Sequence, residues 1–179
     1  MGTVHRHLGY SVFELRSKNI FKLAILTISD AGSKGEREDT SGDAISKMMA
    51  EATGFEETAR EIVADETELI SGKLIEWCDS GDIDLVVTTG GTGLGPRDVT
   101  PEATRQVIDL EVPGMAEAMR METLKITPFA MLSRSVVGVR NGCLIVNLPG
   151  SPKGVAETLE VALRGISHAL EMVKGWRTH

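Results

Sequence analysis

The stretch from Leu85 to Pro101, L-V-V-T-T-G-G-T-G-L-G-P-R-D-V-T-P, constrains the fold of this chain more than any other. An apolar β-type run passes through two threonines into a glycine-rich loop, then into Arg97 and Asp98, and Pro101 is placed to begin a helix. A buried strand that ends in bare backbone amides and a carboxylate suits a phosphate-bearing ligand and a metal ion. A glycine-rich turn at the end of a core strand is the plainer alternative. The density of glycine, cation and carboxylate at one strand end favours a binding site.

The rest of the chain predicts an α/β fold. Nearly continuous apolar runs, typical of strands buried on both faces, predict strands over residues 21–29, 83–89, 135–139 and 143–147. An imperfect alternation that ends in Glu-Ile-Val-Ala predicts another strand over 55–63. The dipeptide Asn141-Gly142 between the last two runs predicts a hairpin, and therefore a sheet that is partly antiparallel. Apolar residues at helical spacing predict helices that begin near Thr40, Thr67, Thr100, Pro113 and Pro152, and a short helix over 129–134. Thr40 or Ser41 is placed to cap the first of these helices, and Thr100 to cap the third.

Composition narrows the class of protein. A chain of 179 residues fits one domain, which we place at residues 20–179, with residues 1–19 as an amino-terminal extension. The net charge of −7 argues against nucleic-acid or anionic-membrane binding. Neither Cys78 nor Cys143 belongs to a Cys-x-x-Cys motif. We therefore expect both to be reduced residues of the core, without a metal or redox role. The sequence has neither a membrane-spanning apolar run nor a signal peptide at its amino terminus, so we expect a cytoplasmic protein.

Three predicted strands end in polar or glycine-rich loops, at Ser29, Thr89 and Asn147. In an open α/β sheet, ligands bind outside the carboxyl ends of the strands. We therefore expect one crevice lined by Ser29, Asp30, Gly90 to Gly93, Asp98 and residues 147–153. Asp65 also follows a predicted strand, but its spacing favours a cap for the helix that begins at Thr67 over a catalytic role.

Two common phosphate motifs are absent from the sequence. The P-loop needs a lysine followed by serine or threonine, whereas Lys73 is followed by Leu74 in a predicted helix. The dinucleotide fingerprint G-x-G-x-x-G needs a third glycine where Pro96 stands. These absences exclude an ordinary P-loop ATPase and an ordinary dehydrogenase.

The glycine-rich stretch T-T-G-G-T-G-L-G-P-R-D-V-T-P-E-A-T (Thr88 to Thr104) resembles a motif of the molybdenum-cofactor-biosynthesis domain. Bacterial MogA and MoaB proteins, the amino-terminal domain of gephyrin and a plant domain share that domain. The segment N-L-P-G-S-P-K-G (Asn147 to Gly154) is similar to its second motif, and I-S-D (Ile28 to Asp30) to its first. The likeness runs from about Phe21 to the carboxyl terminus. Seventeen nearly contiguous motif residues, with a second motif at a compatible distance, make it highly specific.

The resemblance implies a three-layer α/β/α fold with a mixed, mostly parallel sheet, assembled as a homotrimer or hexamer. It implies that ATP and molybdopterin react to give adenylyl-molybdopterin and pyrophosphate, with Mg²⁺ required. Asp98 and Asp65 match the essential acidic positions of active members, which makes them the candidate catalytic residues and Mg²⁺ ligands. The remaining matches imply nucleotide or pterin-phosphate contacts by Ser29, Asp30, Gly90, Gly91, Thr92, Gly93, Asn147, Pro149, Gly150, Ser151 and Lys153.

Two alternatives stay open from the sequence. Some MoaB-type members lack transferase activity, so a scaffold that binds molybdopterin without transferring AMP is the main alternative. A nucleotide pyrophosphatase domain of the competence-damage type, related in fold, is a more distant one. The presence of both acidic positions favours the active transferase.

Overall fold

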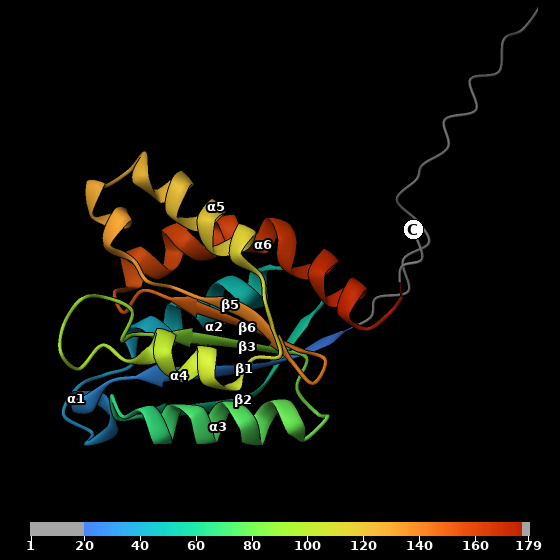
Figure 1. Ribbon diagram of the computed structural model, residues 1–179, viewed down its shortest axis with the longest axis horizontal. Coiled ribbons are helices and arrows are strands. Elements are labelled where there is room, and N and C mark those ends of the chain that lie inside the picture. Colours follow the sequence, from blue (N-terminus) through green and yellow to red (C-terminus); the bar gives the residue numbers. More distant parts are fainter. Residues whose placement is uncertain (1–19, 177–179) are drawn as a thin grey trace, which may run out of the picture.

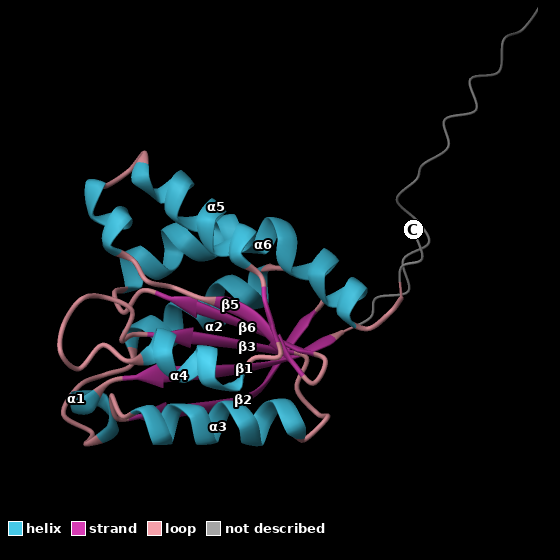
Figure 2. Cartoon of the chain, viewed as in Figure 1, coloured by secondary structure: helices cyan, strands magenta, loops and turns pink. Residues whose placement is uncertain are grey.

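The computed structural model describes residues 20–176, in which helices cover both faces of one six-stranded sheet (Figure 1). The strands are β1 (Phe21–Ile28), β2 (Phe55–Val63), β3 (Leu85–Thr89), β4 (Leu110–Glu111), β5 (Val137–Arg140) and β6 (Cys143–Leu148). The helices are α1 (Asp30–Ser33), α2 (Thr40–Glu51), α3 (Thr67–Asp79), α4 (Thr100–Val107), α5 (Pro113–Leu124), the 3₁₀ helix η1 (Pro128–Leu132) and α6 (Pro152–Val173). The three layers are visible side-on in Figure 2.

The sheet has the order β2-β1-β3-β6-β5-β4. Strands β2, β1, β3 and β6 pair in parallel, and β5 pairs antiparallel with both β6 and β4. The sheet is therefore mixed and mostly parallel, as the sequence predicts. Its central strands β3 and β6 are buried throughout, because helices cover both faces.

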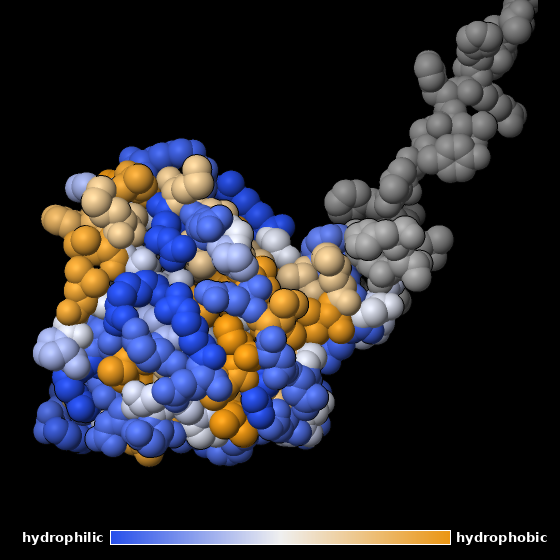
Figure 3. Space-filling model, viewed as in Figure 1, coloured by the Kyte–Doolittle hydropathy of each residue, from blue (hydrophilic) through white to orange (hydrophobic). Residues whose placement is uncertain are grey.

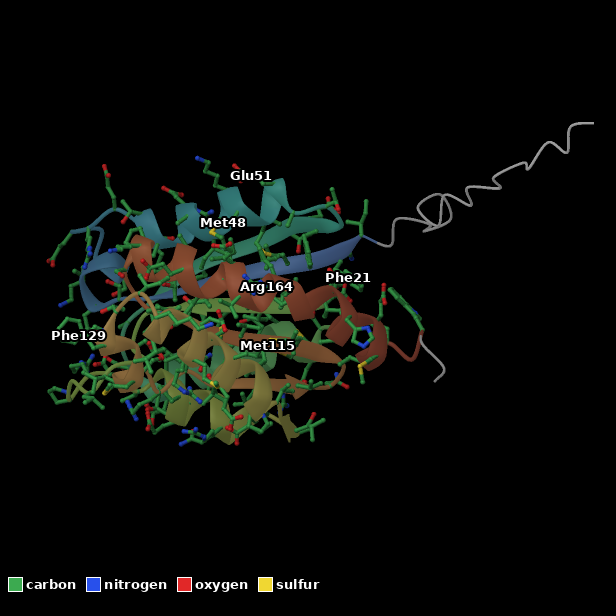
Figure 4. All side chains as sticks on the ribbon, turned by 90° about the horizontal axis from the view of Figure 1, so that it is seen from above. Phe21, Met48, Glu51, Met115, Phe129 and Arg164 are labelled. Atoms are coloured by element: carbon green, nitrogen blue, oxygen red, sulfur yellow. The ribbon has the colours of Figure 1, made fainter. Side chains whose placement is uncertain are left out.

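Alternate residues of each central strand belong to two separate cores. Leu23 and Ile25 of β1 pack with α2, α5 and α6, while Ala24 and Leu26 pack with α3 and α4. This follows from the strand period of two, which sends successive side chains to opposite faces. Figure 4, viewed from above, shows α6 lying between α2 and α5 in the first of these layers.

The predicted hairpin is confirmed. β5 and β6 are antiparallel, and both turn residues have positive φ, +45° at Asn141 and +79° at Gly142. These are the left-handed conformations that a two-residue turn of type I′ requires, and Asn-Gly adopts them at low cost. The predicted strand over 55–63 and the long helix from Pro152 are confirmed as well.

Several local predictions were wrong. Residues after Ser29 form a single helical turn, α1, where a loop was expected. Thr100 does not cap α4, because its hydroxyl instead donates to the Gly90 carbonyl at 2.9 Å. α2 begins at Thr40 as predicted, but its cap is Asp39, which accepts from the Gly42 amide, and not Thr40 or Ser41. The short edge strand β4 had no signal in the sequence, and it separates α4 from α5.

The expected environment of the cysteines is confirmed, since Cys78 and Cys143 are both buried free thiols. The interaction with the Cys78 thiol, together with burial, raises the pKa of the Cys143 thiol far above its ordinary value. No helix in residues 20–176 is both long enough and apolar enough to span a membrane. The predicted extension, residues 1–19, lies outside the described residues.

We predict that Ile145→Ala will lower the free energy of unfolding by about 2–5 kcal/mol, because Ile145 is fully buried in the central strand β6. Urea denaturation measures the change. The control is Ile75→Ala, the same substitution on the exposed face of α3. An equal loss in both variants would contradict the assignment of β6 to the core.

Candidate functional site

The carboxyl ends of β1, β3 and β6 lie side by side, because these three strands are adjacent and parallel. The loops that follow β3 and β6 are joined directly. The Thr89 hydroxyl donates to the Pro149 carbonyl at 2.7 Å, and the Gly90 amide donates to the Leu148 carbonyl at 3.3 Å. From the α2 side, the Ser41 hydroxyl donates to the Gly150 carbonyl at 3.1 Å. The predicted meeting of these strand ends is confirmed.

Glycine is required where the two loops touch. A Cβ atom at Gly90, whose φ is +102°, would lie 2.2 Å from the Ile28 carbonyl oxygen. A Cβ at Gly150 would lie 3.2 Å from the Gly90 Cα. At Gly91 it would lie 2.3 Å from the Thr100 hydroxyl oxygen. The glycines therefore allow three backbone segments to approach more closely than side chains permit.

Two pockets flank this contact and share Gly91 and Gly150 as common lining residues. We call the contact of Gly90, Gly91 and Gly150 the glycine ridge. The larger pocket has a volume of about 610 Å³, within the usual range for small-molecule sites. The smaller one, of about 180 Å³, lies on the side of α1 and the start of α2.

The predicted site residues divide between these pockets. The larger pocket is lined by Gly91, Thr92, Gly93, Asp98, Pro149, Gly150, Ser151 and Lys153. The smaller pocket is lined by Ser29, Asp65, Gly90, Gly91 and Gly150. The two candidate catalytic carboxylates, Asp98 and Asp65, therefore face the glycine ridge from opposite pockets.

Asp98 is held inside its own loop. Its carboxylate accepts a hydrogen bond from the Gly95 amide at 2.6 Å, and its own amide donates to the Gly95 carbonyl at 3.0 Å. A Cβ at Gly93 or Gly95 would lie 2.9 or 2.8 Å from the Asp98 carboxylate. These two glycines thus make room for the carboxylate within the turn.

Asp65 is paired with Asp30 and does not cap α3, so the cap interpretation from spacing was wrong. The N-cap of α3 is Glu66, without a side-chain cap bond. The Asp65 carboxylate accepts from the Asp30 amide at 2.8 Å, and the Asp65 amide donates to the Asp30 carboxylate at 3.1 Å. Arg97 in turn donates two hydrogen bonds to Asp30, at 2.9 and 2.8 Å.

The charges around these aspartates shift their pKa values in opposite directions. Hydrogen bonds from Arg97 lower the pKa of Asp30. Burial raises the pKa of Asp65, and the like charges of Asp30 and Asp98 raise it further. A cation bound near Asp65 would relieve the repulsion from these like charges.

Asn147, Asp30 and Arg97 line neither pocket. Asn147 is completely buried: its amide nitrogen donates to Thr88 and Thr104 at 3.0 and 3.1 Å, and its oxygen accepts from the Val136 amide at 3.3 Å. Its hydrogen bonds hold β6 against β3 and α4 beneath the site, which indicates a supporting role.

Sequence reasoning missed Arg134, which holds the glycine loop from outside. Its guanidinium donates to the carbonyls of Gly93 and Asp98 at 2.7 and 2.6 Å and pairs with Glu102. Its amide donates to the Thr92 carbonyl at 3.0 Å. Arg134 lies between η1 and β5, far from the loop in sequence, so no local pattern could have identified it.

Comparison with known proteins gives a consistent result. Residues 24–168 match the family described as "Probable molybdopterin binding domain". The chain is 47% identical over 154 residues to the molybdopterin adenylyltransferase of Helicobacter pylori (strain J99), covering 86% of this chain and 88% of that protein. It is 43% identical over 144 residues to the enzyme of the same name from Escherichia coli K12, covering 79% and 73%.

A solved structure agrees with these sequence matches. The crystal structure of the molybdopterin biosynthesis enzyme MoaB from Thermus thermophilus superposes with a TM-score of 0.82 at 52% identity, covering 87% of this chain and 98% of that one.

We predict that Gly90→Ala will destabilise the protein more than Gly35→Ala. Both glycines have positive φ, so both alanine variants incur backbone strain of about 1–2 kcal/mol. Only at Gly90 would the new Cβ also collide with a backbone carbonyl, since open space surrounds Gly35. Denaturant unfolding of the two variants compares the costs. Equal destabilisation would show that the close contact at the ridge is not required.

Proposed function

The chain belongs to the molybdopterin-binding domain family of molybdenum cofactor biosynthesis, and we propose that it is a molybdopterin adenylyltransferase. The enzyme transfers AMP from ATP to the terminal phosphate of molybdopterin and releases pyrophosphate. The observation that carries this proposal is the glycine ridge, which has a pocket and a carboxylate on each side. Two anionic substrates can thereby approach the same backbone amides from opposite sides.

The chemistry requires positioning more than proton transfer. The nucleophile is a phosphate of molybdopterin that is already anionic, and it must be held in line with the α-phosphorus of ATP. We assign this holding to the amides of Gly91 and Gly93 and to the loop from Pro149 to Lys153. The Lys153 ammonium, largely exposed at the mouth of the larger pocket, offsets phosphate charge.

The carboxylates of the site fit a Mg²⁺ ion that binds together with ATP. Mg²⁺ usually takes one or two carboxylates and keeps the remaining positions for water and phosphate oxygens. Asp65 and Asp98 are two such carboxylates, and their mutual repulsion favours a cation. Within residues 20–176 no group of three or more His, Cys, Asp or Glu side chains could hold a metal alone. When bound, Mg²⁺ would neutralise charge on the phosphate oxygens.

We also propose that the protein acts in the cytoplasm as a homotrimer or hexamer. Exposed apolar side chains near α5 and η1 support an assembly: Met121, Phe129 and Met131 are 68%, 74% and 64% exposed. Figure 3 shows hydrophobic residues at this end of the molecule, and exposed apolar patches commonly mark interfaces.

The direct test is incubation with ATP, Mg²⁺ and molybdopterin, followed by mass detection of the adenylylated pterin. Calorimetry separates the scaffold alternative, because a scaffold would bind molybdopterin without consuming ATP. Release of AMP from a dinucleotide in the absence of molybdopterin would instead favour the pyrophosphatase alternative.

We predict that Asp98→Asn will abolish adenylyl transfer while the fold stays intact, since the amide can still occupy the loop but carries no charge. The assay is Mg²⁺-dependent release of pyrophosphate with molybdopterin present. The matched control is Asp82→Asn at a highly exposed turn that lines neither pocket, which should leave turnover unchanged. Near-normal turnover by the Asp98 variant would refute the assignment.

For the assembly we expect sedimentation velocity to give a mass of three or six chains. Met131→Asp, at an exposed position that lines neither pocket, should shift the distribution toward smaller species, because a charge would be buried in an apolar contact. A monomer for the unmodified protein would overturn the oligomer proposal.

A further inference from the structure

The larger pocket contains four charged side chains: Asp98, Arg120, Lys153 and Glu157. Two of them are engaged by the protein, because Asp98 accepts from the Gly95 amide and Arg120 donates to the Ser135 carbonyl at 3.0 Å. Lys153 is 83% exposed and sits on the loop assigned to phosphate. Glu157 remains, and neither the family resemblance nor the proposed reaction gives it a role.

Glu157 is an unusual carboxylate because it is largely buried and poorly paired. Its side chain is only 19% exposed, one helical turn beyond Lys153 on α6. Its one ion pair among the described residues is with Lys153, at 3.8 Å, and no hydrogen-bond donor in that part of the chain reaches it. A long pair with an exposed lysine contributes little.

Three hydroxyls that line the larger pocket donate elsewhere, because each bonds within its own segment. Thr158 donates to the Gly154 carbonyl, and Thr123 donates to the Met119 carbonyl at 2.7 Å. Ser133 donates to the Ser135 hydroxyl at 3.0 Å. A partly buried carboxylate with free acceptors favours a ligand that brings its own donors.

The pterin of the proposed substrate brings such donors. Its pyrimidinone ring presents two parallel N–H groups, at N3 and at the 2-amino substituent, which match the two oxygens of one carboxylate. The adenine edge presents one donor beside one acceptor and cannot pair in this way. Resting on the proposed function, we propose that Glu157 recognises the pyrimidinone edge of the pterin and so selects molybdopterin over ATP for the larger pocket.

The assignment of Glu157 to the pterin edge also gives the ligand one orientation in the larger pocket. The phosphate end of the ligand lies at the glycine ridge, beside Gly91 and Gly93. The wall formed by Leu94, Phe129 and Leu132 supplies apolar surface for the flat ring. In Figure 4, Phe129 lies at the left end of the layer formed by α2, α6 and α5, and Phe21 lies toward the right end.

The test uses two small probes that differ at one position, 2-amino-4-oxopteridine and 2,4-dioxopteridine. The dioxo compound keeps N3–H but replaces the amino donor with an acceptor. The unmodified protein should bind the amino compound roughly tenfold or more tightly. In the dioxo compound the C2 carbonyl oxygen would face a carboxylate oxygen of Glu157, so two acceptors would oppose each other. Glu157→Gln should abolish or reverse this preference, since an amide offers one donor and one acceptor. Its affinity for ATP should be unchanged.

The matched control is Glu160→Gln, the same change on an exposed position of α6 outside both pockets, which should keep the preference of the unmodified protein. Calorimetry gives the affinities and thermal unfolding checks the fold. An unchanged preference in Glu157→Gln would overturn the inference. If the Glu157→Gln variant does not fold, the unmodified protein still tests the inference, because equal binding of the two pteridine probes would overturn the inference.

The outcome is separable from that of the proposed function. A protein that adenylylates molybdopterin but shows no dependence on Glu157 would refute only the inference. A protein that discriminates the two pteridines through Glu157 yet never transfers AMP would refute only the transferase.

Discussion

The close contact of three loops at the carboxyl edge of the sheet is the constraint on which the site depends. The parallel pairing of β1, β3 and β6 brings their ends to one edge, and Gly90 and Gly150 let the backbones touch there. Any side chain at Gly90 would meet the Ile28 carbonyl. The ridge divides the crevice into two pockets, and each pocket keeps one of the two candidate carboxylates.

The electrostatics of the site depends on which of its cationic groups remain available to bind anionic phosphates. The chain is acidic overall, and its proposed substrates are anions, so local groups must offset repulsion. Two arginines near the loop are engaged by the protein: Arg97 binds Asp30, and Arg134 binds the carbonyls of Gly93 and Asp98. The amides of Gly91 and Gly93 and the Lys153 side chain can face phosphate together with a bound cation, which is why a divalent metal suits this site.

The regular elements were predictable where one local pattern dominates. Asn141-Gly142 specified the hairpin, and apolar spacing specified α6, because both signals act over a few residues. Predictions failed where distant contacts decide. Asp65 could serve as a helix cap by spacing, but the α1 turn offers the Asp30 amide as a better-placed donor. Asn147 seemed a ligand contact, yet its amide is buried beneath the site.

The sequence by itself determined the α/β class, the glycine loop and the family, because glycines, prolines and acidic residues at fixed spacing reflect backbone geometry and chemistry that few folds share. Only the tertiary structure decided which groups face the ligands. It separated Asp65 from Asp98 by the ridge, assigned Arg134 to the loop and left Glu157 without a donor among the described residues of the larger pocket. These relations join residues far apart in the chain, and burial and hydrogen bonding between them exist only after folding.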